Sequence, residues 1–302
     1  MKRRELLQGS AAFGLFAAIP FPGGKSSRND TGANSSVRPS PLKPPEKGSI
    51  PVAFLVSDGA VVIDFCGPWE VFQDTYIPGG NSNPFQLYTV AETTKPIEAS
   101  GGMKIVPDHD FTTAPPPKVI VIPAQNTRSQ ATLDWIRKSS KSADVTMSVC
   151  TGAFLLGQTG LLAGKAATTH HASYKTFAQQ FQNVQLKRGA RFVEDGNLAT
   201  AGGLSSGIDL ALRVVERYYG REVATETAFQ MEYQGQGWLN PDSNEMYAKA
   251  RRSSLEHPLC PVCGMEVDPK TSATSVYQAN TYYFCSSDHK AKFDAAPATF
   301  LD

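Results

Sequence analysis

Cys150 is the residue of this chain with the strongest case for covalent chemistry. It ends a short apolar run, Val145–Val149, and is followed by Thr151 and Gly152 and then by a run of small and apolar residues from Ala153 to Gln158. The pattern predicts a strand, a sharp turn and a helix, with the cysteine exposed on the turn. The partial positive charge of a helix N-terminus favours a thiolate, so we expect a nucleophile with a lowered pKa rather than a buried packing cysteine.

A second group of reactive side chains lies near the end of the chain. Cys260 and Cys263 form a Cys-x-x-Cys pair, and Cys285 and His289 form a Cys-x-x-x-His pair after a spacer. Three thiolates and an imidazole suit a tetrahedral site for zinc, and also copper(I) or iron. A disulfide between Cys260 and Cys263 is the alternative in an oxidising compartment. Asp288 or His257 are alternatives to His289 as the fourth ligand.

Two further residues are placed to assist Cys150. Asp64 follows the first predicted strand, where a carboxyl group can hold a proton or pass it to a reacting group, although a helix N-cap is an equally good interpretation. His170 follows a later short strand and is a candidate base for Cys150, while such a histidine is more often structural. Cys66 is either a second thiol or a packing residue.

The elements that must position these residues alternate along the chain. The predicted strands are Ile50–Ser57, Phe85–Ala91, Lys118–Pro123, Val145–Val149, Ala166–His170, Gly189–Glu194 and Leu198–Ala201, and a short hairpin is predicted over Ile97–Pro107. One helix is predicted to begin at Pro68. The other predicted helices are Thr127–Ser140, Ala153–Gln158, His171–Phe181, Ser205–Tyr219 and Glu222–Tyr233. This alternation predicts an α/β fold with a mostly parallel sheet covered on both faces. Ligands of such sheets lie beyond the carboxyl ends of the strands, where Cys150 is expected.

Composition divides the 302 residues into five parts. Residues 1–21 have Arg3-Arg4 before a short apolar run and resemble a twin-arginine export signal, which predicts a periplasmic protein that contacts the membrane only through this signal. Residues 22–48 have the composition of a flexible linker. Residues 49–237 form the main domain, 238–257 a linker and 258–302 a small metal-binding module. A net charge of +1 gives no indication of nucleic-acid binding.

Six short motifs of the main domain resemble the ThiJ/PfpI family of the class I glutamine amidotransferase-like superfamily, and its isonitrile hydratase branch in particular. They are Asp64–Pro68, Val149–Ala153, Gly160–Gly164, Ala167–His170, Val193–Asn197 and Gly207–Asp209. The resemblance implies a flavodoxin-like fold, a homodimer and Cys150 as nucleophile. It also implies Asp64 as the acidic residue and Thr151 as the catalytic residue after the cysteine, whose hydroxyl helps to orient the adduct. Residues 258–302 resemble the YHS domain, a small metal-associated module.

One loop departs from the family pattern. A Gly-Gly pair commonly follows the third main strand and helps to form an oxyanion hole, whereas this chain has Pro123-Ala124-Gln125-Asn126. We expect Gly152, Ala124 and Gln125 to take part in binding the developing charge.

These observations predict a cysteine-dependent hydratase or hydrolase that adds water to an isonitrile or a similar small electrophile, with no cofactor in its main site. Two alternatives remain open. In the first alternative, the chain is a metal-handling or redox- or metal-sensing protein without turnover. In the second, it is a ligand-sensing domain related to transcriptional regulators, without their DNA-binding part.

Overall fold

The computed structural model describes residues 39–80, 83–249 and 253–301. The predicted export signal and most of the predicted first linker lie outside these residues. Among the described residues, no helix is both long and apolar enough to cross a membrane.

A seven-stranded sheet in the order β10-β11-β7-β6-β1-β2-β5 forms the centre of the main domain. Every neighbouring pair is parallel except β10 and β11, which form an antiparallel hairpin at one edge. The strands are β1 (Ile50–Leu55), β2 (Phe85–Ala91), β5 (His109–Asp110), β6 (Val119–Ile122), β7 (Val145–Val149), β10 (Phe192–Asp195) and β11 (Leu198–Ala201).

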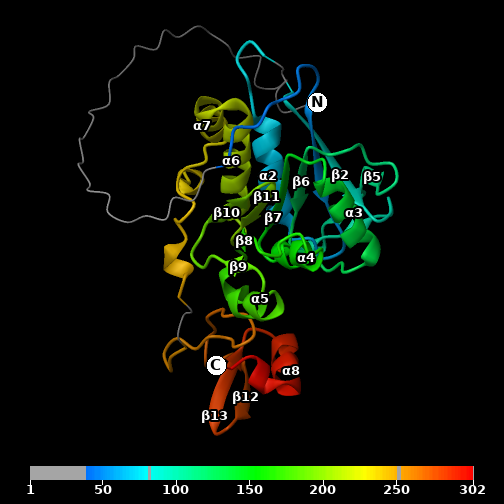
Figure 1. Ribbon diagram of the computed structural model, residues 1–302. Helices are drawn as coiled ribbons and strands as arrows, with labels where there is room; N and C mark the ends of the chain where they lie inside the picture. Colours follow the sequence, from blue (N-terminus) through cyan, green and yellow to red (C-terminus); the bar gives the residue numbers. More distant parts are fainter. Residues whose placement is uncertain (1–38, 81–82, 250–252, 302) are drawn as a thin grey trace, which may run out of the picture. The chain divides into compact units, whose positions relative to one another are not determined.

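Helices cover both faces of this sheet (Figure 1). In β1, Val52 and Phe54 pack in one core with α2 and α6, whereas Ala53 and Leu55 pack in a second core with α3 and α4. Successive side chains of a strand point to opposite faces, so a strand buried on both sides is apolar throughout. The helices are α2 (Val62–Asp74), α3 (Gln130–Ser140), α4 (Gly152–Gln158), α5 (Tyr174–Gln180), α6 (Ser206–Tyr219) and α7 (Arg221–Gln230).

The predicted α/β fold class is confirmed, and most predicted elements are present with shorter bounds. Two-residue strands occur at β3 (Ile97–Glu98) with β4 (Lys104–Ile105) and at β8 (Ala166–Ala167) with β9 (Gln185–Leu186). Single 3-10 turns lie at η2 (Ser100–Gly102), η3 (His171–Ser173), η4 (Gly237–Leu239) and η5 (Glu245–Tyr247).

The start of α2 differs from the prediction in a way that matters for the site. Pro68 was expected at the first helical position, but α2 begins at Val62 and contains Pro68 in its interior. A proline there cannot donate to the carbonyl four residues earlier. Burial of Pro68 against α6, where Gly207 lies close to its ring, offsets this loss. Asp64 therefore lies in the first turn of a helix and not in a loop.

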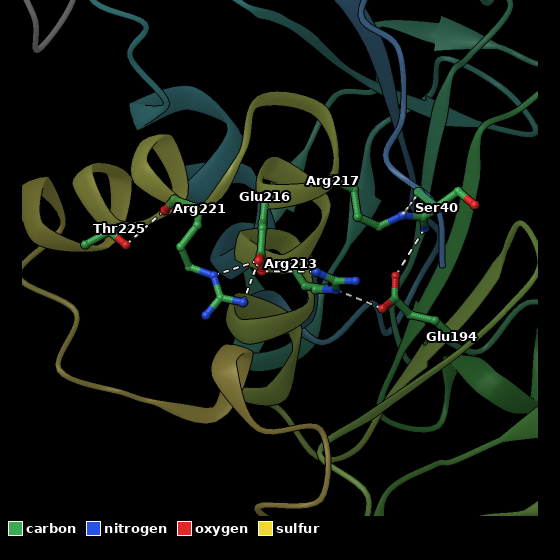
Figure 2. Close-up of polar contacts among 7 residues, drawn as sticks. All are labelled: Ser40, Glu194, Arg213, Glu216, Arg217, Arg221 and Thr225. Carbon is green, nitrogen blue, oxygen red and sulfur yellow. Dashed lines mark hydrogen bonds and ion pairs between the residues drawn. The ribbon is translucent and has the colours of Figure 1, made fainter. Parts of the chain in front are cut away.

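A nearly buried ionic network ties β10 to α6 (Figure 2). The two carboxylate oxygens of Glu194 accept from Arg213 at 2.9 Å and from Arg217 at 3.1 Å. Arg217 also donates through Nε to the Ser40 carbonyl at 3.3 Å, and its own carbonyl accepts from the Leu42 N–H at 2.7 Å. Residues 40–42, within the predicted linker, thus make specific contacts with the main domain.

The C-terminal module contains the hairpin β12 (Ala273–Tyr277) and β13 (Asn280–Phe284), helix α8 (Ser287–Ala295) and the turn η6 (Pro297–Thr299). Its small core is formed by Cys260, Val267, Phe284 and Phe293. Four buried residues are few for an independent fold, so a module of this size is expected to need a metal or a similar staple.

Gly152 is required by the close approach of α4 to β6. A Cβ atom at this position would lie 2.2 Å from the Ile122 carbonyl oxygen and 2.8 Å from that of Pro123. Backbone cannot move aside as a flexible side chain can, so we expect Gly152→Ala to lower the free energy of unfolding by about 3 kcal/mol or more. Denaturant unfolding measures this loss.

Gly160→Ala is the matched control for this substitution. Gly160 has a φ of +80°, but in the described part of the chain no atom outside its chain neighbours lies within 4 Å of its added Cβ. The free energy of unfolding of this variant should therefore fall by only roughly 1 kcal/mol, which is the cost of holding an alanine in the left-handed conformation. Equal losses in the two variants would contradict the backbone-contact argument.

Candidate functional site

Cys150 lies in the turn between β7 and α4, with its backbone in an unusual conformation. Its φ is +57°, in the left-handed region that residues other than glycine rarely occupy. Two hydrogen bonds to the Cys150 backbone hold this conformation: its N–H donates to the Gly202 carbonyl at 2.8 Å, and its carbonyl accepts from the Thr169 hydroxyl at 3.0 Å. A strained backbone fixed from both sides is typical of residues at functional sites.

The sulfur of Cys150 receives donors from two loops. The backbone N–H and the side-chain hydroxyl of Thr151 donate to it, as does the backbone N–H of Leu204. Leu204 follows β11 and also has a positive φ, of +37°. The sequence offered no signal for Leu204, because the path of the loop after β11 depends on tertiary contacts.

The pKa of Cys150 differs from the sequence-based expectation. Burial of the side chain, with the residue only 7% exposed, and the nearby charge of Asp64 raise the pKa to about 11, although the Thr151 and Leu204 donors lower it. The expected lowered pKa is therefore wrong for the resting site. Removal from water and repulsion by a carboxylate outweigh three donors and a short helix.

Asp64 is the partner of this cysteine. It is fully buried in the first turn of α2, and burial raises the pKa of its carboxyl group to about 7 despite a stabilising hydrogen bond from the Ala124 N–H. That bond, to Oδ2, is 3.1 Å long. Among the described residues, Oδ1 has no hydrogen-bond partner. The charge of Asp64 acts on Cys150, which makes the unpartnered carboxylate oxygen a candidate for proton exchange with the thiol.

Burial raises the pKa of Asp64 to about 7, and burial together with the charge of Asp64 raises the pKa of Cys150 to about 11, so near neutral pH Asp64 ionises first and the thiol keeps its proton. The remaining proton is on the thiol when Asp64 is ionised, and its transfer to Asp64 yields the thiolate. The charge repulsion between the two groups disappears in that second form.

Two of the three residues expected to stabilise an oxyanion use their donors elsewhere in this structure. The Ala124 N–H is used by Asp64, and Gln125 donates through Nε2 to the Leu55 carbonyl at 3.1 Å. Gly152 allows the close approach of α4 and β6 described above. The donors at the sulfur come instead from Thr151 and Leu204.

His170 does not have the geometry of a base. Its Nδ1 accepts a hydrogen bond from the Ala172 N–H at 3.3 Å. Burial and the neighbouring His171 lower its pKa to about 4. Cys66 lies on α2, partly buried against the core, and burial and the charge of Glu70 raise its pKa. It therefore has the character of a packing cysteine.

The second predicted site is assembled in the C-terminal module. The ligand atoms of Cys260, Cys263, Cys285 and His289 all lie within 4.8 Å of one another. Cys285 Sγ is 3.5 Å from Cys263 Sγ and 3.1 Å from His289 Nδ1, and Cys260 Sγ is 3.7 Å from the same nitrogen. Zinc–sulfur bonds of about 2.3 Å place two tetrahedral sulfurs about 3.8 Å apart. The donor set and spacing fit a metal ion.

Local structure holds these ligands in place. The Cys260 carbonyl accepts from the Gly264 N–H at 2.8 Å, which closes the Cys-x-x-Cys turn. Burial by itself raises the pKa of Cys260, but the N–H groups of Cys285, Cys263 and Val262 donate to its sulfur and bring the pKa below its ordinary value. All three cysteines are free thiols, so the alternative disulfide is not formed. His257 pairs with Glu266 at 2.6 Å, outside the cluster.

His289 of the module and His257, which directly precedes the module, give a matched test of the metal ligands. We expect His289→Ala to weaken zinc binding by roughly 100-fold or more, because it removes one of four ligands. His257→Ala should leave zinc affinity within about twofold, since its ring lies outside the cluster. Competition with a chromophoric chelator measures both affinities, and equal losses would contradict the assignment.

Comparisons with known proteins agree with this geometry. The profile of the DJ-1/PfpI family matches residues 51–217, and that of the YHS domain matches residues 260–302. Isonitrile hydratase from Pseudomonas putida is 33% identical over 190 residues, which cover 61% of this chain and 79% of that protein.

Solved structures give the same fold. A ThiJ/PfpI family protein from Pseudomonas syringae superimposes with a TM-score of 0.56 and 28% identity over 63% of this chain and 77% of its own. DJ-1beta from Drosophila melanogaster superimposes with a TM-score of 0.53 and 18% identity over 62% of this chain and all of its own.

Proposed function

Because the chain belongs to the DJ-1/PfpI family, we propose that it is a cysteine-dependent hydratase that converts an isonitrile, or a similar small electrophile, into an N-substituted formamide. The observation that carries the proposal is the strained Cys150 beside a buried Asp64 with an unpartnered oxygen. The similarity to isonitrile hydratase supports this choice of substrate class.

The reaction begins with proton transfer from the Cys150 thiol to Asp64 Oδ1. The sulfur attacks the terminal isonitrile carbon, and the proton held by Asp64 passes to that carbon, which gives a thioimidate. The pKa of about 7 suits Asp64 to both proton transfers near neutral pH. The Thr151 and Leu204 donors stabilise the sulfur before it attacks.

Water then adds to the thioimidate carbon. The two protons of the water go to different atoms. Asp64 passes one of them to the departing sulfur, and the nitrogen gains the other. Collapse of the adduct breaks the carbon–sulfur bond and releases the formamide and the free thiol. Over the whole cycle one water is added and no electrons are transferred.

A direct assay tests this proposal. The purified chain is incubated with small alkyl isonitriles, glyoxals and primary amides, and products are followed by nuclear magnetic resonance. Formation of N-alkyl formamide by the wild-type chain, and not by the Cys150 variant discussed below, is the expected result. Turnover of none of these compounds would leave the alternative of a metal-handling protein without turnover.

The Cys3His cluster supports a separate metal function for the C-terminal module. We propose that Cys260, Cys263, Cys285 and His289 hold zinc, copper(I) or iron. Four protein ligands fill a tetrahedral site, so a zinc ion there would stabilise the module and not activate water. The residues of the main site supply all the proton transfers that the hydration needs.

We further propose that the protein is exported to the periplasm and forms a homodimer. The Arg3-Arg4 pair before a short apolar run supports export, and the family resemblance supports the dimer. Fractionation of cells and light scattering of the purified chain test the two proposals.

A further inference from the structure

The mechanism leaves His170 without a chemical step, although its ring lies close to the active-site loops. Because Nδ1 accepts from the Ala172 N–H, the neutral ring carries its proton on Nε2. Neither nitrogen then has a free lone pair with which to take the proton of Cys150. Any influence of His170 on the reaction must pass through its packing.

The edge of the ring that bears Cδ2 and Nε2 faces Gly203. A Cβ atom built on Gly203 would lie 2.6 Å from Cδ2 and 3.2 Å from Nε2 of His170. Gly203 lies between the two loop residues that contact Cys150: the Gly202 carbonyl accepts from the Cys150 N–H, and the Leu204 N–H donates to its sulfur. The imidazole thus packs against the middle of the loop that holds the nucleophile.

Two further rings pack beside His170. The ring of His171 lies 4.3 Å from that of His170, and the ring of Tyr247 stacks on His171 at 4.9 Å and 26°. Tyr247 belongs to the segment after the main domain, and it joins the site only through tertiary packing. His170 therefore contacts His171 as well as Gly203, and His171 in turn contacts Tyr247.

We infer that His170 is a positioning residue whose ring, backed by His171 and Tyr247, holds the Gly203–Leu204 loop against Cys150. The consequence for turnover rests on the proposed function, whereas the consequence for the sulfur does not. The readout is therefore the rate at which iodoacetamide alkylates Cys150, located by mass spectrometry and measured as a function of pH.

Two single variants and their combination make the first test. Gly203→Ala should slow alkylation of Cys150 about tenfold near pH 8, because the new methyl group collides with the ring and moves the Leu204 donor from the sulfur. His170→Ala should slow it about threefold and raise the reactivity pKa, because the loop loses its support. The double variant should be only about threefold slower than the wild type, like His170→Ala and faster than Gly203→Ala alone, because the collision that slows Gly203→Ala is gone. Independent effects would multiply to about thirtyfold.

His170→Asn separates packing from proton transfer. Asparagine keeps an acceptor for the Ala172 N–H and an atom near the position of Cδ2, but it does not titrate. In this variant, Cys150 should be alkylated at a rate within about twofold of the wild-type rate. A rate as low as that of His170→Ala would instead point to the imidazole as a base and would overturn the inference.

Gly202→Ala is the control for the rescue. Its added Cβ would lie 2.9 Å from Asn244 Nδ2 and does not meet His170. Addition of His170→Ala should not restore its alkylation rate. Rescue of both glycine variants, or of neither, would overturn the inference. If no isonitrile is turned over but the alkylation rates of the variants follow the expected pattern, only the proposed function is refuted and the positioning role of His170 stands.

Discussion

Replacement of Cys150 by serine is expected to lower kcat/KM by about 10³-fold or more and to abolish the covalent intermediate. A serine hydroxyl is a far weaker nucleophile than a thiol, and Asp64, with a pKa of about 7, is too weak a base to ionise it. Steady-state kinetics measure the loss, and mass spectrometry of the protein quenched during turnover detects the adduct on Cys150.

Cys66→Ser is the matched control for that substitution. Cys66 is a partly buried thiol on α2, two residues from Asp64, and it packs against the core. Its loss should change kcat/KM by less than about threefold, with any stability loss seen separately by thermal unfolding. A Cys150→Ser variant with wild-type turnover would refute the covalent mechanism.

Replacement of Asp64 by asparagine is expected to have opposite effects on activity and stability. Loss of the proton acceptor should lower kcat/KM by about 10²-fold or more. The pH profile should also change. The wild-type rate should rise as Asp64 ionises at about pH 7. The rate of the variant should rise only at alkaline pH, where the Cys150 thiol itself ionises. A wild-type profile in the variant would contradict the role of Asp64.

The stability effect of the same variant follows from the direction of the pKa shift. The pKa of Asp64 is raised from 3.8 to about 7 by burial, so the folded state holds its proton more strongly than the unfolded chain. Below pH 3.8 the carboxyl is neutral in both states. Between pH 3.8 and about 7 the wild type loses stability, because the unfolded chain releases this proton while the folded state retains it, and the loss is complete once the folded carboxyl has ionised.

Asp64→Asn should therefore become more stable than the wild type as the pH rises from 4 to 8. The gain should approach roughly 4 kcal/mol at most, from about three pKa units at 1.36 kcal/mol each. Urea unfolding at several pH values measures it. Asp134→Asn, at an exposed position of α3, should change stability by less than about 0.5 kcal/mol at every pH.

The sequence predicted the elements of the fold well because they are encoded locally. Buried parallel strands are continuous apolar runs, and Phe85–Ala91 matches β2 residue for residue. The start of α2 was missed because Pro68 is normally a sign of a helix start, and only packing on α6 makes an interior proline tolerable.

The candidate sites divide in the same way. The metal cluster could be predicted because two short motifs, Cys260–Cys263 and Cys285–His289, each fix the spacing of their own ligands. The donors at the Cys150 sulfur could be predicted only in part. Thr151 adjoins the cysteine in sequence, whereas Leu204 reaches it through a loop over 50 residues away.

Residue types and their spacing are enough to identify the groups capable of chemistry: a cysteine at a strand–helix turn, an acid after the first strand and a set of soft metal ligands. Their protonation and their roles depend on the folded chain. Burial and the charge of Asp64 raise the pKa of Cys150 to about 11, and packing against Gly203 makes His170 a supporting ring. Desolvation and contact between distant segments depend on the whole folded chain, so no local pattern encodes them.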